Sequence, residues 1–181
     1  MKKMIMICIA LLAMSACKKA NDYVPLTEED VAAIPYQMGQ TVKFLTQDND
    51  TITFQVTWDE TSLFDYHDDH NYLSEPLDFD SPIVYCDTRT VELTSEAYPF
   101  FMVFTVYPEK VLSFNWNNDL VICNELLPTD EIFSINGHNY DAQHDRLYNQ
   151  YTGEMLYDWY YSEEYGLLYF EKGDFSLTRI P

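Results

Sequence analysis

The chain has 181 residues, of which 47% are hydrophobic and 16% aromatic, enough for one domain with a sizeable core. Its 30 acidic residues outnumber its 10 lysines and arginines, which gives a net charge of −20 at pH 7. A surface this acidic repels nucleic acid and anionic lipids, and it favours cationic partners or divalent cations.

The first 16 residues have the layout of a secretory signal peptide. Two lysines begin it, an apolar run follows over residues 4–14, and small residues then precede a cysteine. The apolar run is too short to remain as a membrane-spanning helix, and no second run approaches that length. Removal of residues 1–16 would take two lysines away and leave a net charge of −22.

The residues Met14-Ser15-Ala16-Cys17 resemble the lipobox of bacterial lipoproteins, which is cut just before its cysteine. In that family the thiol receives a diacylglycerol and the freed amine a further acyl chain such as palmitate. The resemblance implies lipidation of Cys17, and two or more acyl chains hold a protein stably on a membrane. Lys18 stands where lipoproteins of the inner membrane often carry aspartate, so we expect the outer membrane, on either face. Ordinary secretion with cleavage nearby is the alternative.

We expect a flexible, lipidated tether over residues 17–35 and a single β-rich domain over residues 36–181. Within the tether, Thr27 is a typical helix N-cap and three acidic residues follow it, which indicates one helical turn ending at Pro35.

The clearest strand pair follows the tether. Apolar residues alternate strictly with polar ones at Val42, Phe44, Ile52, Phe54, Val56 and Trp58. Residues 47–50, Gln-Asp-Asn-Asp, favour a turn. This pattern predicts an antiparallel hairpin with one buried face that includes Trp58.

The rest of the chain continues as short strands. Residues 59–81 are polar and acidic and predict a long loop, whereas Asn136-Gly137 is a strong hairpin signal. Further strands are expected at 83–86, 90–94, 100–107, 111–116, 120–123, 132–135, 138–140, 155–161, 165–170 and 175–179. Helical periodicity is nearly absent, so we predict a mainly β fold: an antiparallel meander that forms a curled sheet, sandwich or half-barrel.

Two further stretches are similar to small lipoproteins of Bacteroidota, a group without assigned function. The first is Tyr36 to Phe44, and the second comprises Ile135 to Tyr140 with Tyr160 to Phe170. The similarity implies a lineage and an envelope location, and it transfers no active site.

Two cysteines remain in the predicted domain, Cys86 and Cys123. An oxidising compartment permits a disulfide between them. Both lie in apolar, strand-like sequence, so buried free thiols are the alternative.

Two groups of residues are candidate ligand sites. His67, Asp69 and His70 could help to bind Zn²⁺ or a similar ion, although a solvated acidic loop explains them as well. Another group, Tyr157, Trp159 and Tyr161, shares one face of a strand and could stack on a glycan or peptide. Core packing is the alternative for these aromatic residues.

No local catalytic signature is present: the sequence has neither a nucleophile elbow nor a glycine-rich phosphate loop. We therefore expect an envelope binding or accessory module that is not an enzyme and needs no cofactor. Its partner would be a cationic protein, a peptide or a glycan, and one specific version is an acidic inhibitor of a cationic hydrolase such as lysozyme. The rival interpretation is a secreted hydrolase or metalloprotein.

Overall fold

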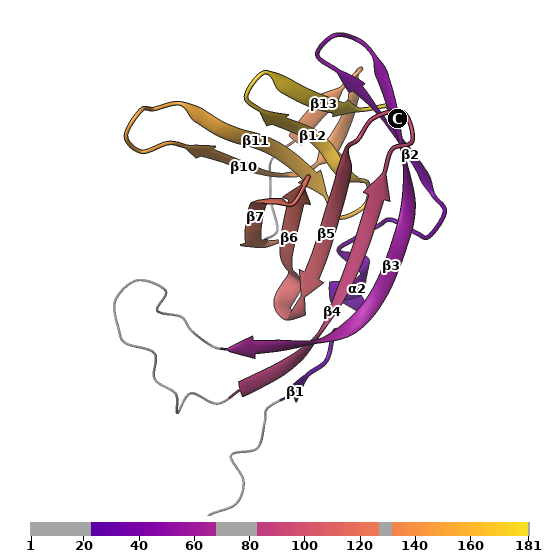
Figure 1. Ribbon diagram of the computed structural model, residues 1–181, viewed down its shortest axis with the longest axis vertical. Coiled ribbons are helices and arrows are strands. Elements are labelled where there is room, and N and C mark those ends of the chain that lie inside the picture. Colours follow the sequence, from indigo (N-terminus) through magenta and orange to yellow (C-terminus); the bar gives the residue numbers. More distant parts are fainter. Residues whose placement is uncertain (1–22, 68–82, 127–131, 181) are drawn as a thin grey trace, which may run out of the picture.

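The computed structural model describes residues 23–67, 83–126 and 132–180, which form a mainly β domain (Figure 1). One sheet contains eleven strands, and a separate sheet contains two. The large sheet comprises β1 (Tyr23–Val24), β2 (Thr41–Thr46), β3 (Thr51–His67), β4 (Ile83–Thr94), β5 (Phe101–Tyr107), β6 (Val111–Trp116), β7 (Asp119–Glu125), β10 (Gln143–Tyr148), β11 (Met155–Ser162), β12 (Gly166–Lys172) and β13 (Phe175–Arg179). The small sheet is the hairpin β8 (Ile132–Ile135) and β9 (His138–Asp141). Two short helices, α2 (Glu28–Ala32) and the 3₁₀ turn η1 (Pro108–Lys110), complete the fold.

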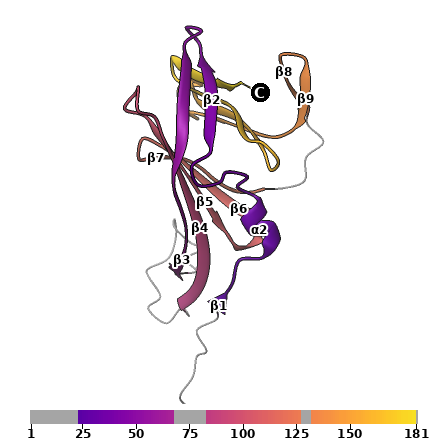
Figure 2. The same cartoon turned by 90° about the vertical axis from the view of Figure 1, so that its right-hand side faces the viewer.

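The large sheet curls into a half-barrel, as the alternating sequence predicted. Its strand order is β10-β11-β12-β13-β2-β3-β4-β5-β6-β7, with antiparallel neighbours throughout, and β1 adds in parallel to β4. The two ends of this path meet at one point, where the Gln143 side-chain amide donates a hydrogen bond of 3.1 Å to the Glu125 carbonyl. The second view shows the sheet folding over on itself, with α2 at its lower part (Figure 2).

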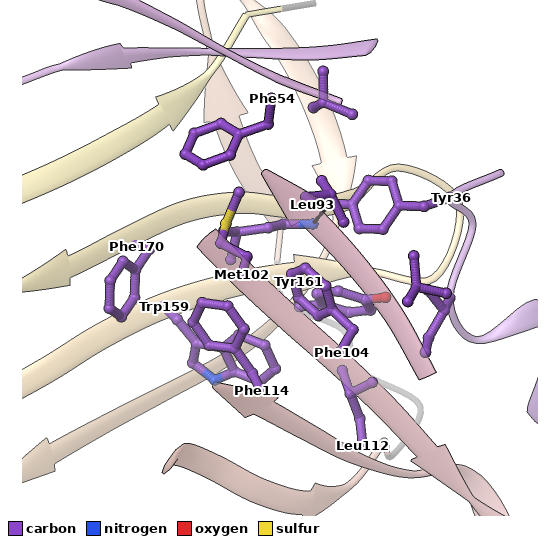
Figure 3. Packing of buried hydrophobic residues seen from close by; sticks show 14 of the residues in the cluster. Tyr36, Phe54, Leu93, Met102, Phe104, Leu112, Phe114, Trp159, Tyr161 and Phe170 are labelled. Atoms are coloured by element: carbon purple, nitrogen blue, oxygen red, sulfur yellow. Dashed lines mark hydrogen bonds between the residues drawn. The ribbon is translucent and has the colours of Figure 1, made fainter. Parts of the chain in front are cut away.

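Aromatic side chains fill the inside of the curled sheet (Figure 3). Phe104 and Phe114 extend from β5 and β6, and their rings stack with centroids 4.9 Å apart. Trp159 approaches from β11, with its ring 5.9 Å from that of Phe114, and Phe170 approaches from β12. Each of these side chains is fully buried, and burial of one large apolar side chain contributes about 1.5–3 kcal/mol. The interior is therefore a packed core.

The N-terminal segment closes one end of this core. The Thr27 hydroxyl caps α2 in a capping box with Asp30, as the sequence predicted. Beyond α2, Ala33, Ile34 and Tyr36 are almost fully buried. The last residues of the tether predicted over 17–35 therefore belong to the folded domain, because Asp30, Ala33 and Ile34 are buried.

Arg89 of β4 holds the end of α2 and the following residues against the sheet. Its guanidinium donates to the backbone carbonyls of Val31, Ile34 and Tyr36, at 2.7–2.8 Å. It also forms a two-pronged ion pair with Asp59 of β3, with both N–O distances 2.9 Å. The planar guanidinium has five N–H donors in a fixed arrangement, so it can hydrogen-bond to all of these oxygen atoms at once, whereas a lysine ammonium group could not.

The β2–β3 hairpin is confirmed, but the prediction that Trp58 lies on its buried face is wrong. Val42 pairs with Phe54, and both are buried. A bulge then places Val56 opposite Leu93 but Trp58 opposite Glu92, so that one extra residue reverses the alternation. Trp58 is consequently 52% exposed.

Three other differences concern where strands begin and end. The loop predicted over residues 59–81 is wrong for residues 59–67, which extend β3 and pair with β4. The runs at 83–86 and 90–94 form the single strand β4. Strand β10 was missed because its first four residues, 143–146, are polar on both faces, so no period of two is visible. Pairing with a neighbouring strand decides these segments.

The hairpin β8–β9 is confirmed and packs on the outer face of the large sheet. Asn136 and Gly137 have φ angles of 50° and 80°, as a tight turn of this type requires. Ile135 and Tyr140 of the hairpin form a small second core with Leu168 of β12. Across the described ranges, none of the helices has the length and apolar character to span a membrane.

Candidate functional site

The three aromatic residues proposed for ligand stacking belong to the core or its border. Trp159 and Tyr161 are each 1% exposed, so the interpretation as core packing holds for both, and neither side chain is available to stack on a ligand. Tyr161 donates a hydrogen bond of 2.8 Å to the Ala33 carbonyl. Tyr157 is half-buried and its hydroxyl lies 3.4 Å from the Asp145 carboxylate. Burial, together with Asp145, raises the pKa of Tyr157 to about 12.

The predicted metal ligands stay untested. His67 is the last residue of β3, whereas its side chain and the residues Asp69 and His70 lie outside the described part of the chain. Among the residues that are described, no three His, Cys, Asp or Glu side chains gather as a metal site.

The candidate disulfide is not formed in this structure. Cys86 is a buried free thiol, and burial, together with Asp87, raises its pKa. Across the sheet, Thr90 of β4 lies in line with Cys123 of β7, with β5 and β6 between them. Cys86 is four residues before Thr90 in β4, so it is farther still from Cys123. Three strand spacings are about 14 Å, whereas bridged Cα atoms lie within about 7 Å.

A polar cluster that the sequence did not reveal lies on the outer face of β10 and β11. Asp158 is 4% exposed, and its carboxylate faces His144 and Arg146 of the neighbouring strand. His144 Nε2 lies 2.8 Å from one carboxylate oxygen, and Arg146 Nε donates to the other at 2.8 Å. The hydrogen bond to Asp158 is the main cause of the raised pKa of Arg146. Both oxygens of the buried carboxylate are thus engaged, one of them by an arginine whose side chain is 40% exposed, which suits a structural ion pair at the surface.

Aromatic rings continue this cluster toward the β8–β9 hairpin. The Tyr160 ring is stacked between Phe133 and His144, with centroid distances of 4.0 and 4.2 Å. Phe133 belongs to β8, so the stack fixes the hairpin to the large sheet. Because the three residues come from three strands, no local sequence pattern could have predicted it.

Beyond this cluster, the β10–β11 hairpin projects from the half-barrel (Figure 1). Arg146 Nη1 lies 3.4 Å from the Tyr148 hydroxyl, which connects the ion pair to the end of the hairpin. The large apolar side chains exposed there, which we call the hairpin tip, are Leu147, Tyr148, Tyr151 and Leu156. Tyr151 is 88% exposed, the highest value among the large hydrophobic residues described. In the sequence, residues 147–157 stand out because Glu154 is their only charged residue.

The turn that carries Tyr151 is held by its own hydrogen bonds. The Asn149 side-chain oxygen accepts from the backbone N–H groups of Tyr151 and Thr152, at 2.9 and 3.2 Å. Backbone bonds of 2.8 Å join Asn149 to Gly153 and Glu154. The tip is therefore both exposed and locally ordered.

The basic side chains of the described domain are largely engaged by acids. Of its six lysines and arginines, Arg89, Lys110, Arg146 and Lys172 form ion pairs with carboxylates. The charge presented to a partner is consequently dominated by carboxylates. Comparison of the chain with protein-family models, with curated proteins and with solved structures finds no match.

Proposed function

We propose that the protein is a lipid-anchored lipoprotein of the outer membrane that works as a non-catalytic binding module for a cationic partner. The observation that supports the partner's charge is the acidic surplus, because 30 acidic residues face only 10 basic ones in the chain. Most basic side chains of the described domain are also neutralised by ion pairs. Such a surface attracts cationic proteins and accelerates their association.

The anchor is carried by Cys17, which directly follows the predicted signal peptide. Wild-type protein should begin at Cys17, incorporate labelled palmitate and partition into detergent. The variant Cys17→Ala should lose the label and either stay uncleaved or become soluble. A mature N-terminus elsewhere, without acyl mass, would refute the anchor.

The specific version of the binding function is inhibition of a cationic hydrolase, for which lysozyme is the test case. We expect lysozyme binding and inhibition at low ionic strength and a clear loss at high salt, because exposed charges are screened within about 10 Å at 0.1 M. Binding that is absent, or that is unchanged in high salt, would contradict a charge-driven partner.

A further inference from the structure

We infer that the hairpin tip is the surface that docks on the cationic partner protein. This inference rests on the proposed function and adds the site. Leu147, Tyr148, Tyr151 and Leu156 bring four exposed large apolar side chains into ten residues of one projecting hairpin. Consecutive strand residues point to opposite faces, so Leu147 and Tyr148 lie on the two faces of the hairpin end, and a partner that covers both must surround the tip. Exposed apolar side chains that gather at one place mark interaction sites, whereas single ones do not.

The tip has the properties of an interface anchor. Tyrosine is enriched among the residues that contribute most to binding, because its rigid ring supplies a large contact area and a polar hydroxyl. The hydrogen bonds of Asn149 order the turn beneath Tyr151 before any partner arrives. Arg146 lies between Asp158 and the Tyr148 hydroxyl, so it also orients the second tyrosine. Preorganisation of this kind lowers the entropy lost on association.

The position of the tip disfavours the anchoring membrane as its partner. Tyr23 is only six residues after Cys17, a stretch that spans at most about 20 Å when extended. β1, which begins at Tyr23, lies at the lower end of the domain in both views (Figures 1 and 2). The β10–β11 hairpin lies in the upper half (Figure 1). A short anchor at Cys17 therefore holds the opposite end of the domain near the bilayer and presents the tip to other molecules.

Charge distinguishes the two remaining candidates for the partner of the hairpin tip, which are a second copy of this chain and another protein. A second copy of the mature chain would also carry a net charge of −22, which opposes self-association. Around the tip, Asp145 and Glu154 are acidic, and Arg146 is neutralised by Asp158. The surface that complements this arrangement has an apolar centre for the tyrosines and basic groups at its rim. Such a surface belongs to a cationic protein.

The test compares tip variants with variants of other exposed residues, using lysozyme as the probe. Tyr151→Ala and Leu147→Ala remove tip contacts, while Met38→Ala and Trp58→Ala remove side chains of similar size that are 59% and 52% exposed elsewhere. The affinity of the mature, acylated protein in detergent micelles is measured at low salt. We expect each tip variant to bind at least about tenfold more weakly, with controls within about twofold of wild type.

The other outcomes separate this inference from the proposed function. If wild type binds lysozyme and the tip variants match the controls, the docking surface is wrong and the proposed function stands. If wild type does not bind, both are overturned. If sedimentation shows a wild-type dimer that Tyr151→Ala converts to a monomer, a second copy covers the tip and the inference is refuted. Circular dichroism of every variant checks that it is folded.

Discussion

Gly166 occupies a position where no other residue should fit. It has φ +77°, and a Cβ added there would lie 2.2 Å from the Tyr36 hydroxyl oxygen and 2.3 Å from the adjacent ring carbon. Tyr36 cannot withdraw, because its ring is buried against Phe104 with centroids 5.3 Å apart. Its hydroxyl also accepts a hydrogen bond of 2.7 Å from the Leu167 N–H.

The cost of Gly166→Ala follows from these contacts. A left-handed φ costs an alanine about 1–2 kcal/mol, and overpacking in a full core costs about 1–3 kcal/mol. Loss of the hydrogen bond between Tyr36 and Leu167 adds about 1 kcal/mol. We therefore expect the free energy of unfolding to fall by about 3–6 kcal/mol, a large part of the 5–15 kcal/mol of a typical domain.

Gly173→Ala is the matched control, since Gly173 has φ +61° but nothing within 4 Å of the added Cβ. It should cost about 1–2 kcal/mol, because only the backbone is strained. Urea unfolding of both variants in a Cys17→Ala background can be followed by tryptophan fluorescence, since Trp159 lies in the core. If the two substitutions agree within about 0.5 kcal/mol, the close packing of Gly166 on Tyr36 is refuted.

Three other perturbations test the polar contacts. Arg89→Lys should lower the free energy of unfolding by about 2–4 kcal/mol, because an ammonium group cannot bind Asp59 and the three backbone carbonyls at the same time. A variant that melts at the wild-type temperature would show that these Arg89 contacts do not stabilise the domain. Although burial opposes it, hydrogen bonds from Thr27 and Lys110 lower the pKa of Asp30. The stability that Asp30 contributes is therefore complete above about pH 4 and is lost as the pH falls through its lowered pKa, so Asp30→Asn should flatten the acid side of a stability–pH curve. Without reductant, maleimide should label Cys86 slowly in native protein, because the thiol is buried and its pKa raised, and rapidly in urea; a thiol that reacts in urea only after reduction would indicate a disulfide.

Local sequence was sufficient for elements whose cause is local. The alternation from Ile52 to Val56, the Asn136-Gly137 turn and the cap at Thr27 each depend on neighbouring residues. They could be predicted because a strand has a period of two and because caps and tight turns need particular residue types at fixed spacing. The signal peptide and Cys17 are also recognised from local sequence, and the lipidation of Cys17 stays a prediction.

Tertiary structure alone decided the contacts that join distant segments. Tyr36 and Leu167 are 131 residues apart, yet their hydrogen bond closes one end of the core. One extra residue beside Val56 exposed Trp58, and pairing with β11 made a strand of the polar β10. The cluster around Asp158 and the projecting tip depend on that same pairing. A sequence records which residues could make such contacts, but only the register of the paired strands and the docking of the hairpins decide which ones meet.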